Sequence, residues 1–181
     1  MRPVFCAIGI TLCVLPVLTG ADLTVLLDFE DTHAARPVAA MEAEAEKLLT
    51  ASGVSVAWRP LHDLLPGESF PKLAVVKFTG HCELTPLAPA APEDGSPLGF
   101  THSVDGRIIP FGEVECDRVR ATLAQAHQAI APETRDALFG RALGRVLAHE
   151  LFHILSGSTA HANRGLMQRY LSAAKLVEDR L

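Results

Sequence analysis

The chain has no cluster of basic residues and no internal repeat. Its 181 residues include 16 Lys and Arg against 21 Asp and Glu, so the formal net charge is −5 at pH 7. Proteins that bind nucleic acids usually present a concentrated positive surface to the phosphates. The sequence therefore argues against nucleic acid as a partner.

A long membrane-spanning run is also lacking, and the one apolar run at the N-terminus is short. It extends from Val4 to Leu18, follows Arg2 and precedes the small residues Thr19-Gly20-Ala21. This pattern predicts a secretory signal peptide over residues 1–21 and a single domain over residues 22–181. We expect the mature protein to be secreted or held in the periplasm or cell envelope, without a stable membrane partner. An uncleaved membrane anchor is the alternative. No cysteine follows the run directly, so a lipid attachment site is not indicated.

Cysteine is scarce, with four residues in the chain. Cys6 and Cys13 lie in the predicted signal peptide, which leaves Cys82 and Cys116. Exported proteins fold in oxidising compartments, so the even pair predicts a disulfide bond. Two buried free thiols are the alternative.

The most informative feature that the chain does contain is an HExxH motif at residues 149–153. His149 and His153 are spaced i, i+4, so on a helix both imidazoles lie on one face and reach one metal ion. Glu150 lies beside that site and can accept a proton from a water molecule there. Zinc suits imidazole ligands and hydrolysis without redox chemistry. The alternative is a buried helix whose histidines only bond to carbonyl groups in the core.

The motif falls within a predicted helix over Pro132–Leu155, with Gly157 as its stop. Gly140, Gly144 and Ala148 follow one another at four-residue intervals along it. Each helical glycine costs about 1 kcal/mol relative to alanine, so this stripe predicts close packing of a neighbouring element.

Residues 149–167, HELFHILSGSTAHANRGLM, resemble the metzincin zinc proteases, whose pattern is HExxHxxGxxH followed by a methionine turn. They also resemble short secreted bacterial proteases with HExxH, a glycine, a later histidine and Gly-x-Met. The resemblance implies a zincin-like α+β fold, with a small mixed sheet and an active-site helix. It implies that His161 is the third zinc ligand and Met167 the turn methionine. Two spacings depart from the pattern, because Gly157 and His161 come four and eight residues after His153.

Other residues compete with His161 for the third ligand position. Thermolysin-like proteases use a downstream glutamate, for which Glu178 on a predicted C-terminal helix qualifies. Peptide deformylases use an upstream cysteine, for which Cys116 qualifies, although their other motifs are absent. His127 and His102 are further candidates. Tyr170, three residues after Met167, is a candidate oxyanion donor or extra ligand, and a structural role is its alternative.

The rest of the chain predicts a mixed order of strands and helices. Apolar runs and helical periodicity predict strands at Leu23–Phe29, Val54–Trp58 and Leu73–Phe78 and helices at Val38–Ser52 and Asp117–Ile130. Thr85–Pro97 is proline-rich and predicts a loop. Asp105-Gly106 predicts a hairpin between strands at Phe100–Ser103 and Arg107–Phe111. In metzincin-like proteases an edge strand pairs with the extended substrate, so this hairpin is the candidate edge, or else an ordinary structural hairpin.

These observations together predict a zinc metalloendopeptidase that acts on peptide or protein substrates. His149, His153 and His161 would bind Zn²⁺, and Glu150 would act as general base. Two other functions stay open: an exported zinc-binding protein without turnover, and a structural domain in which HExxH is incidental.

Overall fold

The computed structural model describes residues 21–84, 96–127 and 132–179. Within them the chain forms one sheet of five strands, in the order β2-β1-β3-β5-β4. The strands are β1 (Leu23–Phe29), β2 (Val56–Pro60), β3 (Leu73–Thr79), β4 (Gly99–Val104) and β5 (Arg107–Glu115). The first three and β5 run parallel, and β4 pairs antiparallel with β5. The predicted mixed α+β class is confirmed.

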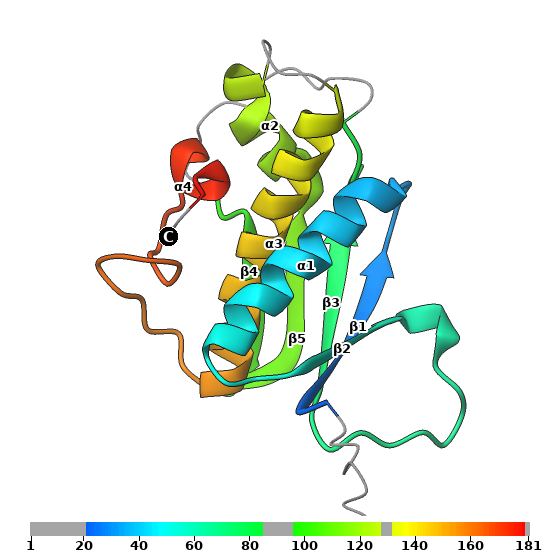
Figure 1. The fold of residues 1–181 in the computed structure, drawn as a ribbon. Coiled ribbons are helices and arrows are strands. Elements are labelled where there is room, and N and C mark those ends of the chain that lie inside the picture. The colour runs from blue at the N-terminus through cyan, green and yellow to red at the C-terminus, as the bar shows by residue number, and fades with distance from the viewer. Residues whose placement is uncertain (1–20, 85–95, 128–131, 180–181) are drawn as a thin grey trace, which may run out of the picture.

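The helices are α1 (Ala35–Ala51), η1 (Leu61–Asp63), α2 (Cys116–His127), α3 (Pro132–Ser156) and α4 (Ala173–Val177). Parallel neighbours need a crossover connection, and α1 supplies it between β1 and β2. In Figure 1, α1 and α3 lie side by side across one face of the sheet. Strand β3 alternates buried and half-buried residues, and its buried set, Ala74, Val76 and Phe78, packs in the core beneath these helices.

The glycine stripe of α3 packs against α1, as predicted. A Cβ atom at Gly140 would lie 2.4 Å from the Pro37 carbonyl oxygen, and one at Gly144 would lie 2.6 Å from that of Met41. Only glycine lets the two helix backbones approach this closely. This close contact therefore fixes the spacing between α1 and α3.

The predicted hairpin is confirmed, with Asp105 and Gly106 as its two-residue turn. Both have positive φ, 52° and 74°, as a type I′ turn requires. The turn joins Val104 to Arg107, so β4 ends one edge of the sheet and is paired only on its β5 side. The predicted sheet edge is therefore present.

Beyond α3 the chain reverses direction. The helix ends at Ser156, and Gly157 follows with φ 62°, which is the predicted stop. Residues 157–179, called the return segment below, then run back beside α3 and end in α4 (Figure 1). Its only buried side chains are those of Leu166 and Leu176.

Cys82 and Cys116 form the predicted disulfide bond, which joins the residues after β3 to the start of α2. Other predicted elements are present, but their ends differ from the prediction: α1 begins three residues earlier than predicted, and β2 begins two residues later. Residues 1–20 of the predicted signal peptide (1–21), most of the predicted 85–97 loop and the end of the predicted second helix (128–130) lie outside the described residues. Among the described residues, no helix combines the length and apolar character needed to cross a membrane.

Candidate metal centre

The HExxH residues lie in the last two turns of α3, on its sheltered side. His149 and His153 are both buried, and their rings meet edge to face with centroids 4.7 Å apart. The four-residue spacing places one ring above the other on a single helix face. Helix geometry alone therefore brings these two imidazoles together.

Two main-chain carbonyls fix the tautomer of these rings. His149 Nδ1 lies 2.9 Å from the Leu166 oxygen, and His153 Nδ1 lies 2.6 Å from the Ser158 oxygen. A carbonyl oxygen only accepts hydrogen bonds, so each Nδ1 must carry the donated proton. In the neutral ring the other nitrogen, Nε2, then holds a free lone pair.

The two Nε2 atoms lie 3.0 Å apart. With both Nδ1 atoms protonated, two lone pairs face each other across this gap, an arrangement that calls for a cation between them. A shared proton or a metal ion satisfies this need. Burial, the largest cause, lowers the pKa of His149; the bond to the Leu166 carbonyl raises it, and the charges of His153 and His161 lower it further.

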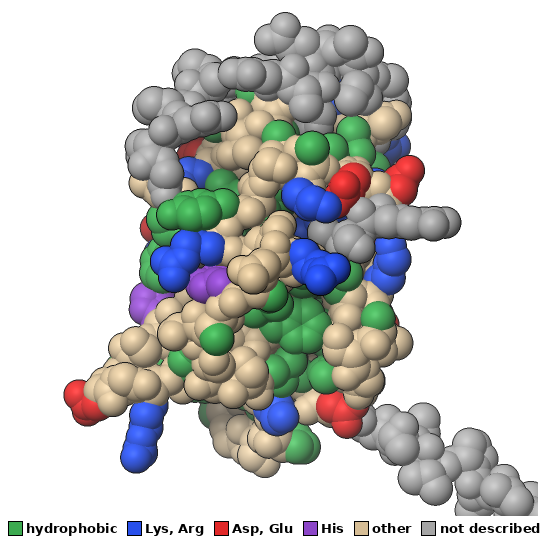
Figure 2. Space-filling view, turned by 90° about the vertical axis from the view of Figure 1, so that its left-hand side faces the viewer, with side chains coloured by type: hydrophobic (Ala, Val, Ile, Leu, Met, Phe, Trp, Pro, Cys, Tyr) green, Lys and Arg blue, Asp and Glu red, His purple; other side chains and the backbone are tan. Residues whose placement is uncertain are grey.

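His161 completes the cluster from the return segment. Its ring centroid lies 5.3 Å from that of His149 and 4.9 Å from that of His153. One ligand nitrogen from each of the three rings lies within 4.8 Å of the other two. Figure 2 views the molecule from the side of the return segment, where histidine side chains reach the surface. His161 itself is exposed, so the cluster has two buried members and one open to solvent.

A hydrogen-bonded turn presents His161. The Ala162 amide donates to the Met167 carbonyl at 2.7 Å, and Gly165 allows the turn with φ 75°. The same turn aims the Leu166 carbonyl at His149. One short loop therefore supplies both the third imidazole and a contact that fixes the tautomer of the first.

Glu150 points from α3 toward the edge strand. It is 4% exposed, and its Oε2 accepts a hydrogen bond of 2.7 Å from the Thr101 hydroxyl of β4. Burial raises the pKa of Glu150 to about 7, against the lowering effect of the Thr101 bond. Gly99 makes room for this approach, since a Cβ there would lie 3.3 Å from Glu150 Cγ.

The rivals of His161 lie elsewhere. The sulfur of Cys116 is bonded to Cys82 and is not available as a thiolate ligand. The Glu178 carboxylate binds Lys175 Nζ at 2.7 Å, and His102 pairs with Glu113 at 3.2 Å. The side chain of His127 lies outside the described residues. Within the described ranges, His149, His153 and His161 form the one group with metal-ligand spacing.

Met167 and Tyr170 are the two remaining candidates from the sequence. Met167 is half-buried and contributes its carbonyl to the turn at Ala162. Tyr170 is 71% exposed. Among the described contacts, no side-chain interaction joins either of them to the three histidines.

Sequence reasoning missed Thr101, Ser158 and Leu166. Ser158 and Leu166 act through main-chain carbonyls, which every residue possesses, so side-chain chemistry gives no signal for them. Thr101 meets Glu150 across 49 residues of sequence. Nothing in the local pattern indicates that pairing.

No family model, curated protein or solved structure matches this chain.

These residues fit a zinc ion. Ligand atoms of a tetrahedral zinc site with Zn–N bonds of about 2.0–2.1 Å lie about 3.3 Å apart. The two helix nitrogens are close to that separation, at 3.0 Å. Each also has its second ring nitrogen bonded to a carbonyl, which is the usual support for a metal-ligating histidine.

Proposed function

We propose that this protein is a secreted zinc-dependent metallopeptidase with a zincin-like fold. His149, His153 and His161 hold the zinc ion, and Glu150 is the general base. The observation that carries the proposal is the convergence of two Nε2 lone pairs at 3.0 Å between carbonyl-bound imidazoles. A buried polar cluster of this kind is costly unless a cation compensates it.

A bound zinc ion would supply a Lewis acid at the three imidazoles and lower the pKa of a coordinated water toward neutrality. Glu150 is adjacent to His149 in sequence and is not a ligand, so its carboxylate is free to accept a proton from water and return it to the leaving amine. Thr101 occupies only Oε2 of that carboxylate. This bond holds the carboxylate in one orientation and leaves Oε1 for the proton transfer.

The edge strand β4 supports a peptide substrate. It has no strand partner on the side away from β5, and its Thr101 contacts Glu150 directly. An extended peptide can add to such an edge through main-chain hydrogen bonds. It would then lie next to the proposed general base, which favours peptide bonds over small esters or phosphates as the substrate.

A zinc-binding protein without turnover is the second candidate. The observation that favours it is the burial of Glu150, because a base that is 4% exposed has little access to substrate. The two functions differ in one measurement. Cleavage of a peptide library by the zinc-loaded protein supports the peptidase, and tight zinc without cleavage supports the alternative.

The variant Glu150→Ala tests the proposed base. It should keep zinc, because Glu150 is not a ligand, and should lose hydrolysis by several orders of magnitude. Peptide cleavage rates and zinc content by elemental analysis measure the two effects. Glu113→Ala is the matched control, because Glu113 follows Gly112, which faces Glu150, and so points to the opposite face of the sheet. Retained cleavage by Glu150→Ala would rule out the mechanism, and no stoichiometric metal in the parent protein would rule out the metal site.

A further inference from the structure

Four side chains of α3 bind the return segment along one line. Arg141, Arg145, His149 and His153 recur every fourth residue, so they form a single stripe on the helix. Each donates a hydrogen bond to a main-chain carbonyl of residues 157–179. The metal ligands are thus the last two members of a longer row of donors.

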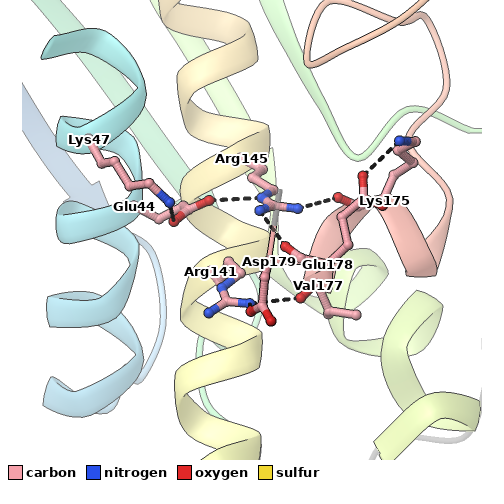
Figure 3. Close-up of polar contacts among 8 residues, drawn as sticks. All are labelled: Glu44, Lys47, Arg141, Arg145, Lys175, Val177, Glu178 and Asp179. Atoms are coloured by element: carbon pink, nitrogen blue, oxygen red, sulfur yellow. Dashed lines mark hydrogen bonds and ion pairs between the residues drawn. The ribbon is translucent and has the colours of Figure 1, made fainter. Parts of the chain in front are cut away.

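Arg145 is the most enclosed member of this row. It is 1% exposed, and its guanidinium donates to the carbonyls of Lys175 at 2.5 Å and Glu178 at 2.6 Å (Figure 3). Its Nε binds Glu44 of α1 at 2.9 Å. A buried guanidinium needs such partners, because an unpaired buried charge is strongly destabilising. Arg145 therefore fixes the end of the return segment to both helices.

Arg141 holds the same end one helical turn away. Its Nη1 donates to the Val177 carbonyl at 2.8 Å and lies 2.9 Å from Asp179 Oδ1 (Figure 3). Apart from Leu166 and Leu176, the return segment buries no side chain. Leu171, Ala173 and Val177 are half-buried and also pack against the core, so the segment docks through both apolar packing and these polar contacts.

We propose that Arg141 and Arg145 are positioning residues for the metal centre. By anchoring the far end of the return segment, they keep its near end in place, where His161 and the carbonyls of Ser158 and Leu166 meet the helix histidines. Metal affinity and docking of the return segment are then coupled. The inference rests on the metal-binding part of the proposed function and is independent of hydrolysis.

The coupling has two consequences. Loosening the anchor lowers zinc affinity, and zinc in turn holds the return segment against α3, because coupling between two sites is reciprocal. The contacts use main-chain carbonyls of Lys175, Val177 and Glu178. Side-chain substitutions of Lys175 and Glu178 therefore leave the coupling intact, whereas substitutions of the two arginines do not.

The test is a zinc titration of the full chain with Arg141→Ala and a matched control, Arg59→Ala. Both arginine side chains are 31% exposed, and each makes one ion pair and one bond to a carbonyl. Arg59 binds Glu68 and Asp63, outside the return segment. We expect Arg141→Ala to weaken zinc binding about fivefold or more, the lower end of typical coupling, and Arg59→Ala to leave it unchanged.

The double variant Glu44→Gln/Arg145→Gln removes the deeper anchor without leaving an unpaired buried charge, since Lys47, which also pairs with Glu44, is exposed to solvent; it should weaken zinc binding further. Limited trypsin digestion gives a second readout, since Arg164 and Arg169 are exposed in the return segment. In the parent protein, zinc should slow cleavage after these residues at least fivefold relative to cleavage after exposed Lys72. Arg141→Ala should reduce this protection.

The outcomes separate the two proposals. If the parent protein binds no zinc, both the metal centre and the coupling are wrong. If it binds zinc and the Arg141 and Arg145 variants match Arg59→Ala in affinity and protection, only the coupling is wrong. Weaker zinc binding with intact far-ultraviolet circular dichroism and reduced protection supports the coupling, and rules out general unfolding as its cause.

Discussion

The described residues between 21 and 156 and the return segment, residues 157–179, are stabilised in different ways. The first region is built on apolar burial, with a continuous core between the sheet, α1 and α3. The second fully buries only Leu166 and Leu176, packs a few half-buried apolar residues against the core, and is also held by arginine and histidine side chains bound to its carbonyls. Two proposed ligands belong to the first region, and His161 belongs to the second.

This difference sets how firmly each ligand is held. The separation of His149 and His153 is fixed by helix geometry and by packing of α3 against α1 and the sheet. The position of His161 depends on the hydrogen bonds that close its own turn and join the return segment to α3, each worth about 0.5–1.5 kcal/mol net. Damage to the first region should therefore unfold the protein, whereas damage to the second should mainly weaken metal binding.

The largest effect on stability is expected from Gly144→Val, which disrupts the helix packing of the first region. Its Cβ would lie 2.6 Å from the Met41 carbonyl oxygen, so α1 and α3 would have to separate. We expect the free energy of unfolding to fall by about 4 kcal/mol or more, measured by urea denaturation. Ala43→Val, at an exposed position of α1, should change it by about 0.5 kcal/mol or less. Equal effects of the two substitutions would show that the close helix contact is not a constraint.

Removal of the disulfide is expected to have the next largest effect. Cys82 and Cys116 are 34 residues apart, and in the chain-entropy model a bond closing such a loop contributes about 3 to 4 kcal/mol. The double variant Cys82→Ala/Cys116→Ala should lose about that much stability against urea. Because both cysteines lie in the first region, zinc affinity of the folded protein should change little. A large loss of zinc affinity would show that stability and metal binding are not separated between these two regions.

His161→Ala tests the return segment and should have a smaller effect on stability. His161 is exposed, so without zinc the free energy of unfolding should change by about 0.5 kcal/mol or less. Zinc affinity should fall by more than the tenfold to hundredfold loss of a supporting residue. Isothermal titration with zinc measures this loss.

Glu178→Ala is the control for His161→Ala. Glu178 serves Arg145 through its main-chain carbonyl, which the substitution keeps, so zinc affinity should stay nearly unchanged. A reversed result, with affinity lost in Glu178→Ala and kept in His161→Ala, would assign the third ligand to Glu178.

Local sequence determined most of the elements of this protein. Apolar runs and the Asp105-Gly106 turn predicted all five strands, and helical periodicity predicted the helices that carry most of the core, because burial of one helix face imposes that period on any chain. The turn at Asp105-Gly106 and the stop at Gly157 followed from the backbone conformations that these residues accept. The two helix histidines followed as well, since residues four apart on a helix must be neighbours.

Only the tertiary structure determined which residues contact those elements. The order of the strands, the contact of Thr101 with Glu150 and the docking of the return segment on Arg141 and Arg145 join residues that are far apart in sequence. Several of the contacts end on carbonyl oxygens, which are the same at every position and leave no trace in the sequence. The sequence therefore specified the two proposed ligands on the helix, and the fold decided which third imidazole, and which carbonyls, would meet them.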